Sequence, residues 1–204
     1  LKALNMEYLD VLLLHRPDAL MEPDEVAEAF DRLYAAGKVR FFGVSNHNPM
    51  QMRLLEKSLH QKLQVNQLQI GIAHTPMIDS GMAVNMAIDQ SINRDGGVLD
   101  YCRLNDITIQ AWSPFQKGFF EGVVFNDKEK YAGLNEEICR LAEQYQVAPT
   151  AIATAFLTRH PANIQVILGT TSIAHMRESC AGASLPLTRE EWYGLYKAAG
   201  NMIP

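Results

Sequence analysis

The stretch Lys38–Asn46, KVRFFGVSN, decides the fold that this sequence predicts. Gly37 ends the preceding helical pattern, and an apolar, β-branched and aromatic run follows over Val39–Val44. An apolar run of this length between breakers predicts a strand that is buried on both faces. The run stops at Ser45 and Asn46, so two hydrogen-bonding side chains follow the strand at the end where parallel α/β sheets bind ligands.

Similar strand patterns, each followed by a helical pattern, recur on both sides of this stretch. The expected strands cover residues 8–14, 39–44, 63–70, 107–112 and 164–168. Strand, helix and strand within about 35 residues form a βαβ crossover, which makes the two strands parallel. Helix starts are expected at Pro23, Pro49, Gly97, Asn135 (as a cap), Pro149, Ile173 and Thr188, the last forming a capping box with Glu191.

Five parallel βα units are consistent with a doubly wound sheet or with part of a barrel. An eight-unit barrel typically needs about 250 residues, whereas this chain has 204. A barrel would therefore lack roughly three units, and we expect them to be missing at the N-terminus because the last helix is capped and complete. No flexible linker interrupts the sequence, so residues 1–204 are expected to form a single domain.

Composition excludes several classes of partner. The chain is 48% hydrophobic and 20% charged, as in ordinary globular proteins. A net charge of −5 without a Lys/Arg run argues against nucleic acid or an anionic membrane as the main partner. The cysteines lie far apart without a CxxC motif, which favours a reduced cytoplasmic protein: Cys102, Cys139 and Cys180.

The residues that follow the expected strands are chemically distinctive. They are His15; Ser45 and Asn46; Gln67, within its strand; Trp112, Ser113 and Pro114; and Gly169, Thr170 and Thr171. An aromatic face with fixed amide donors suits a flat heteroaromatic ring that carries a carboxamide, and Gly-Thr-Thr before a helix suits a phosphate. GxGxxG, GxxxxGK[ST] and HExxH are absent, so a Rossmann fingerprint, a P-loop and a zinc hydrolase site are unsupported.

Each of these residues also has a plain structural interpretation. A lone histidine such as His15 after an apolar strand is more often a hydrogen-bonded structural residue. Ser45 and Asn46 can simply cap the next helix, and Trp112 can pack in the core. The remaining histidines that lack metal-ligand spacing are expected to be surface or loop residues: His47, His60, His74 and His160.

Five segments, taken in order, resemble the strand-end motifs of the aldo-keto reductases: DVLLLHRPD, GKVRFFGVSNH, LQVNQLQIG, IQAWSPFQKG and VILGTTS. The resemblance covers essentially the whole chain and begins at the family's fourth strand. It implies an α/β fold of the TIM-type (β/α)8 barrel class, with this chain covering about the last five βα units plus a C-terminal helix. It also implies NAD(P)H-dependent reduction of aldehydes and ketones, small-molecule carbonyl substrates, to alcohols.

By that resemblance, His15 hydrogen-bonds the carbonyl oxygen of the substrate. The nicotinamide carboxamide would be held by Ser45, Asn46 and Gln67, and the nicotinamide ring would stack on Trp112. The segment that wraps the pyrophosphate contains Ser113, Phe115, Lys117 and Gly118. The adenosine and its 2′-phosphate would be gripped by Gly169, Thr170, Thr171, His175 and Glu178.

Two features depart from the family's pattern. The catalytic tyrosine, with its lysine and aspartate, lies on strands earlier than any residue here, and neither Tyr8 nor Tyr34 replaces it. General acid catalysis worth typically ~10²–10⁴ in rate would then be absent, so an inactive partial barrel that binds nucleotide, or self-associates through open edges, is the alternative. His175 stands where the family often places an arginine on the 2′-phosphate, so NADP is expected and NAD is possible.

Overall fold

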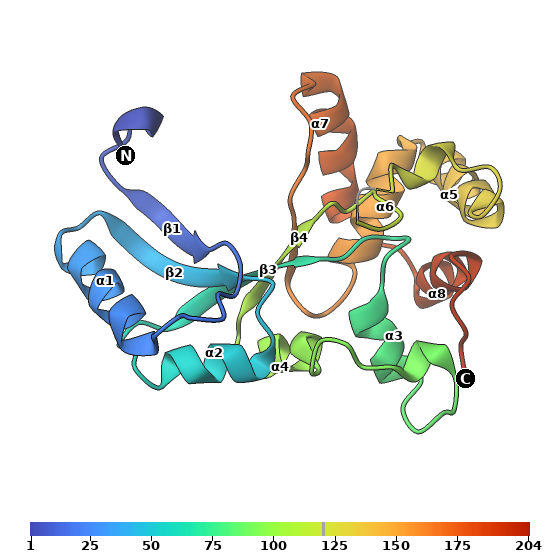
Figure 1. The fold of residues 1–204 in the computed structure, drawn as a ribbon. Helices are drawn as coiled ribbons and strands as arrows, with labels where there is room; N and C mark the ends of the chain where they lie inside the picture. The colour runs from blue at the N-terminus through green and yellow to red at the C-terminus, as the bar shows by residue number, and fades with distance from the viewer. Residues whose placement is uncertain (120) are drawn as a thin grey trace. The chain divides into compact units, whose positions relative to one another are not determined.

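The computed structural model describes residues 1–119 and 121–204, and Figure 1 shows its fold. The strands form one sheet in the order β1-β2-β3-β4-β5. β1 pairs with β2, and β2 with β3, in parallel. The strand bounds are β1 Leu9–Leu14, β2 Val39–Ser45, β3 Leu63–Gln69, β4 Thr108–Trp112 and β5 Ile164–Val166. The predicted α/β class with a parallel sheet is confirmed.

Helices follow the strands as the sequence predicts. The α-helices are α1 Pro23–Ala35, α2 Pro49–Glu56, α3 Pro76–Met82, α4 Val98–Leu104, α5 Ala132–Tyr145, α6 Pro149–Thr158, α7 Ile173–Cys180 and α8 Arg189–Ala198. Short 3-10 turns are η1 Lys2–Leu4, η2 Asp89–Ser91, η3 Val124–Asn126 and η4 Ala181–Ser184. None of the described helices is long and apolar enough to cross a membrane.

The chain divides into two compact units. The first contains residues 1–68 and 95–109, and the second contains residues 69–94 and 110–204. The single domain predicted from the sequence stays a prediction.

The core of the first unit forms where α1 and α2 cover one face of the strands (Figure 1). Phe30 of α1 stacks on Phe42 of β2, with ring centroids 4.1 Å apart. Met52 and Leu55 of α2 are fully buried. Because side chains alternate along a strand, Phe41 points to the opposite face and remains 51% exposed. The prediction that this strand is buried on both faces is therefore wrong at its beginning.

Gly43 of β2 has no room for a side chain. A Cβ atom there would lie 2.5 Å from the Val65 carbonyl oxygen and 2.7 Å from Leu13 Cδ2. We expect Gly43→Ala to lower the free energy of unfolding by about 1–3 kcal/mol, as overpacking does. The control is Gly133→Ala in α5, where an added Cβ meets no atom within 4 Å and the helix gains about 0.5–1 kcal/mol. Urea unfolding of both variants checks this; an equal effect of the two would contradict it.

The second unit packs around α6, whose residues 151–157 are all buried. Gly182 of η4 lies directly against the Ala151 carbonyl group. The predicted capping box of α8 is confirmed, since the Thr188 and Glu191 side chains each accept a hydrogen bond from the other residue's backbone N–H. Glu191 also accepts from the Tyr145 hydroxyl at 2.8 Å, which ties α8 to α5.

Asn135 does not cap a helix, so this prediction is wrong. The helix begins earlier, at Ala132. The Asn135 side chain instead donates to the backbone carbonyls of Val124 and Asp127 at 2.9 and 2.8 Å. Its amide therefore holds the preceding turn against α5.

Candidate functional site

The carboxyl ends of β2 and β3 meet in a small hydrogen-bonded cluster in the first unit. Ser45 is buried and pairs in register with Gln67. The Ser45 hydroxyl and the Asn46 backbone N–H both donate to the Gln67 carbonyl oxygen, at 2.9 and 3.0 Å. The Asn46 side-chain amide donates to Ser45 Oγ at 2.7 Å. Three residues predicted to hold one ligand group are thus brought together.

Asn46 adopts a left-handed backbone conformation, with φ of 59°. Such a conformation is unfavourable for residues with a Cβ, although asparagine tolerates it better than most. Non-glycine residues held in this region cluster at ligand sites. Here the two hydrogen bonds to the Gln67 carbonyl oxygen stabilise it, so β3 sets the direction in which Asn46 leaves β2.

His15 lies at the same end of the sheet. Leu14, the last residue of β1, pairs in register with Val44. The next residues along the two parallel strands are His15 and Ser45, so both lie at the carboxyl ends of neighbouring strands. The His15 side chain is exposed, in keeping with a residue that meets a ligand from solvent.

His47 lies in the loop between β2 and α2, so its predicted loop position is confirmed, but the side chain is buried there and not on the surface. Its side chain is 1% exposed, and its Nδ1 lies 2.9 Å from the Ser45 carbonyl oxygen, to which Nδ1–H donates. Asn66, which is fully buried, donates from Nδ2 to the His47 carbonyl oxygen at 2.8 Å. His47 thus links the backbone of Ser45 to Asn66 through two hydrogen bonds. No spacing in the sequence signals this, because the contact joins the loop after β2 to Asn66 on β3.

The burial of His47 has a consequence for pH dependence. Burial lowers the pKa of His47 from its ordinary value of 6.5, opposed by the hydrogen bond to the Ser45 carbonyl. The unfolded chain then binds a proton at this site that the folded chain does not, so stability is lost as pH falls below about 6.5. We expect His47→Gln to reduce this slope in urea unfolding. Equal slopes in wild type and His47→Gln would contradict the assignment.

In the second unit, Trp112 ends β4 and is half-buried. Phe119 meets its ring edge-on, with centroids 6.2 Å apart at 80°. Ser113, which follows, also has a left-handed backbone, with φ of 51°. β5 lies beside this strand end, because the Ile167 N–H donates to the Ala111 carbonyl oxygen at 3.0 Å. Trp112 and Ser113 therefore neighbour the segment that leads into residues 169–171.

The segment predicted to wrap the pyrophosphate folds back on itself. The Val124 N–H donates to the Phe115 carbonyl oxygen at 2.9 Å, and the Lys117 N–H donates to that of Gly122 at 3.0 Å. Lys117 Nζ forms an ion pair with Asp127 at 2.7 Å. This lysine, followed by backbone N–H donors, lowers the pKa of the Asp127 carboxyl to about 2. An anion that uses Lys117 must therefore compete with a carboxylate for it.

Gly118, in the same segment, faces a carboxylate as well. An added Cβ on Gly118 would lie 2.8 Å from the Glu121 side chain. Together with Asp127, this places negative charge beside the residues that were predicted to meet the pyrophosphate. Residues 113–118 therefore suit the anionic pyrophosphate less well than Ser45, Asn46 and Gln67 suit the carboxamide.

The last predicted residues surround the start of α7. Thr170 Oγ1 accepts a hydrogen bond from the Ser172 N–H at 3.1 Å, and Ser172 caps the helix by accepting from the His175 N–H. Thr171, His175 and Glu178 are exposed. Gly169 is exposed too, and an added Cβ there would meet no atom within 4 Å. This turn is open to a ligand.

Neither a metal centre nor a disulfide is found in the described part of the chain. Groups of three or more His, Cys, Asp or Glu that could hold a metal ion are absent among the described residues. Cys102 is buried, and Cys139 and Cys180 are exposed; all three are free thiols. Burial raises the pKa of the Cys102 thiol to about 12, which keeps it protonated and unreactive.

Comparison with known proteins gives a consistent result. Residues 1–198 match the family model described as "Aldo/keto reductase family". The chain is 32% identical over 200 residues to a 6-dehydroglucose reductase of Agrobacterium fabrum, covering 98% of this chain and 60% of the relative. It is 34% identical over 200 residues to oxidoreductase YdhF of Escherichia coli, covering 97% and 60%. The chain thus spans 60% of the length of these curated relatives.

Solved structures show the same fold. An aldo-keto reductase from Klebsiella pneumoniae in complex with NADPH superimposes with a TM-score of 0.70 at 22% identity. The match covers 98% of this chain and 62% of that one.

Proposed function

The chain belongs to the aldo/keto reductase family, and from this premise we propose that the protein reduces small aldehydes or ketones to alcohols with NAD(P)H. The relatives named as reductase and oxidoreductase support this activity. When bound, the cofactor would supply the hydride that reaches the carbonyl carbon. Cytoplasmic location is part of the proposal and rests on the free cysteines.

One observation carries the proposal: the cluster of Ser45, Asn46 and Gln67 at the carboxyl ends of two parallel strands. It gathers a hydroxyl and two side-chain amides, which are the donors and acceptors that a carboxamide group needs. A cap or a core position does not require the left-handed Asn46 backbone, with φ of 59°. The donor set therefore fits a nicotinamide ring.

The remaining roles follow from position. His15, one residue beyond the end of β1, would donate to the carbonyl oxygen of the substrate and orient it. Trp112 would present its ring to the nicotinamide face. Ser113, Phe115, Lys117 and Gly118 would meet the pyrophosphate, and residues 169–171 with His175 and Glu178 the adenosine end. Lys117 would have to exchange Asp127 for the phosphate.

We propose NADP as the cofactor, with NAD as the alternative. Relatives of known structure bind NADP or NADPH. His175 is exposed at the start of α7, where it can approach a 2′-phosphate. An imidazole is a weaker phosphate partner than the bidentate guanidinium group of arginine, so the preference for NADPH over NADH is expected to be modest.

No proton donor is assigned among residues 1–204. Tyr8 precedes the first strand, at its amino end, and the Arg40 guanidinium carbon lies 3.8 Å from the centre of its ring. Tyr34 lies on α1, with 57% of its surface exposed. Neither is at the carboxyl ends of the strands. The reductase activity is accordingly proposed for the whole protein.

A matched pair of asparagine variants tests the cofactor assignment. Asn46 and Asn163 both have left-handed backbones, with φ of 59° and 52°, so alanine brings a similar backbone cost at either position. Only Asn46→Ala removes a predicted cofactor ligand, and we expect it to weaken NADPH binding about three- to tenfold, as the loss of one hydrogen bond does. Calorimetric titration of the two variants measures this. Equal affinities would contradict the role of Asn46.

Self-association is the second candidate, and one observation favours it. β1 is one of the two edge strands in the sheet order, and Val11 on it is 37% exposed. Exposed strand edges can pair with another chain. Sedimentation velocity would show dimers that dissociate in Val11→Lys; a monomer at all concentrations would reject this alternative.

A further inference from the structure

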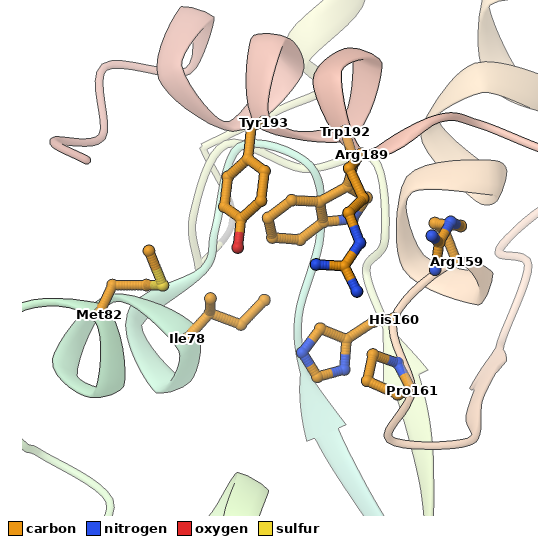
Figure 2. A pocket seen from close by; sticks show the side chains of 8 residues that line it. All are labelled: Ile78, Met82, Arg159, His160, Pro161, Arg189, Trp192 and Tyr193. Atoms are coloured by element: carbon orange, nitrogen blue, oxygen red, sulfur yellow. The ribbon is translucent and has the colours of Figure 1, made fainter. Parts of the chain in front are cut away.

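A cavity of about 340 Å³ lies in the second unit, and none of its lining residues is assigned to the cofactor. Figure 2 shows its walls from close by. α3 contributes Ile78 and Met82 on one side, and α8 contributes Trp192 and Tyr193 on the other. The turn that follows α6 closes the cavity with basic side chains. Its size is within the range of pockets that bind small organic molecules.

The aromatic wall is rigid. Trp192 is 8% exposed, its ring stacks on Phe156 at 4.7 Å, and its Nε1–H donates to the Phe156 carbonyl oxygen at 2.8 Å. Tyr193 meets the indole edge-on at 5.0 Å. α8 is tied to α3 because the Tyr196 hydroxyl donates to Asp79 Oδ1 at 2.7 Å. The two helices that form the walls are therefore held in place before any ligand arrives.

The remaining wall is positively charged. Arg159, His160 and Arg189 line it, and Figure 2 shows the Arg189 side chain reaching past Trp192 toward the His160 ring. Arg159 uses Nε to donate to the Leu187 carbonyl oxygen at 2.8 Å, which fixes the side chain and leaves its terminal nitrogens for another acceptor. In the described part of the chain, neither arginine forms an ion pair with a carboxylate.

The His160 ring is held by the backbone of its own turn. Its Nδ1 accepts a hydrogen bond from the Ala162 N–H at 3.2 Å. An imidazole nitrogen that accepts carries no proton, so in the neutral ring the proton is on Nε2. The Nε2 atom of His160 therefore carries a proton whether the ring is neutral or charged. The acid on the opposite helix, Asp79, is occupied by the Tyr196 hydroxyl.

We propose that this cavity binds a small organic carboxylate with a ring-sized apolar body. The planar guanidinium forks of Arg159 and Arg189 match a carboxylate, to which arginine can bind through two parallel hydrogen bonds. Ile78 and Met82, with the aromatic wall, would cover the apolar body. A free inorganic anion would leave those apolar surfaces unused, and a neutral ring would leave both guanidinium charges without a counter-ion.

Two-dimensional ¹H–¹⁵N NMR of the protein without cofactor tests the proposal, because the chain has 2 tryptophans and hence two indole N–H signals. The Trp192 signal is assigned from a Trp112→Phe variant. The probes are phenylacetate, phenylacetamide, which has the same shape without the charge, and acetate, which has the charge without the ring. We expect a saturable shift of the Trp192 signal with phenylacetate. Binding should be at least about tenfold weaker for phenylacetamide, which loses the charged hydrogen bonds, and for acetate, which buries no ring.

Matched arginine variants locate the binding. Arg189→Gln is expected to weaken phenylacetate binding about tenfold or more, whereas Arg177→Gln, which removes the same charge from the exposed surface of α7, changes it less than about twofold. Both sites are exposed, so both variants should fold. No saturable shift, equal binding of phenylacetamide or acetate, or equal weakening by the two variants would each overturn the proposal. Since no cofactor is present, these outcomes are independent of the proposed reductase activity.

Discussion

Replacing Trp192 with alanine is expected to lower the free energy of unfolding by about 3–5 kcal/mol, the cost of truncating a buried large aromatic residue. Trp192 stacks on Phe156 at 4.7 Å and on Tyr196 at 5.5 Å, and its indole N–H is used by the Phe156 carbonyl oxygen. Alanine would leave a cavity between α6 and α8 and remove that donor. Urea unfolding monitored by circular dichroism measures the loss.

The neighbouring residue provides the control for this variant. Tyr193 lies on the same helix but is 38% exposed, so Tyr193→Ala removes less buried surface and should cost less than half as much. A loss below about 1 kcal/mol for Trp192→Ala would mean that the second unit does not depend on this stack.

His15→Ala is expected to lower kcat of the whole natural protein by about 10²–10³, the usual cost of removing one donor to a developing oxyanion. The proposed role requires His15 to donate to the carbonyl oxygen as hydride arrives at the carbon. Because the side chain is exposed in the loop after β1, the substitution should leave the fold intact. The affinity for NADPH should also be unchanged, since His15 is assigned to the substrate and not to the cofactor.

Steady-state kinetics with an aldehyde and NADPH measures this effect, and His60→Ala serves as the control. His60 lies elsewhere in the first unit, paired with Asp31 at 3.0 Å, and is outside the proposed machinery. A decrease in kcat of less than about threefold for His15→Ala, or an equal decrease for His60→Ala, would remove His15 from the proposed catalytic role.

Much of the fold is predictable from local sequence. The strand after Gly37 was expected at residues 39–44 and spans Val39–Ser45, because a glycine and two polar residues bound an apolar run. Pro49 begins α2 and Thr188 caps α8 as predicted, and both helix starts carry a capping box, formed by Asn48 with Gln51 and by Thr188 with Glu191. These features depend on residues close together in the sequence.

Features that depend on distant residues were not predictable. The left-handed conformation of Asn46 is stabilised by the Gln67 carbonyl oxygen on another strand. The backbone of His47 is held by Asn66, whose side chain donates to the His47 carbonyl oxygen from β3. The ion pair of Lys117 with Asp127 was also missed, because the motif IQAWSPFQKG ends at Gly118 and does not include Asp127. The Asn46 conformation, the environment of His47 and the Lys117–Asp127 ion pair all depend on contacts that form only when the chain folds.

The candidate site shows the same division. The types of its residues and their order along the chain follow from the strand-end motifs, so the predicted set could be proposed before any geometry was known. Whether each side chain faces a ligand depends on its neighbours. Ser45 and Asn46 are held by β3 as the proposal requires, whereas Gly118 has the Glu121 carboxylate beside it.

Titration with NADPH and then NADH, followed by tryptophan fluorescence, tests the central claim most directly. We expect saturable quenching by both cofactors, stronger for NADPH. The quenching should persist in Trp192→Phe, because Trp112 is the reporter, and should weaken in Asn46→Ala, which keeps that reporter. A folded protein that shows no saturable quenching, or quenching that is the same in Asn46→Ala and lost in Trp192→Phe, would contradict the assignment of the strand ends as the cofactor site.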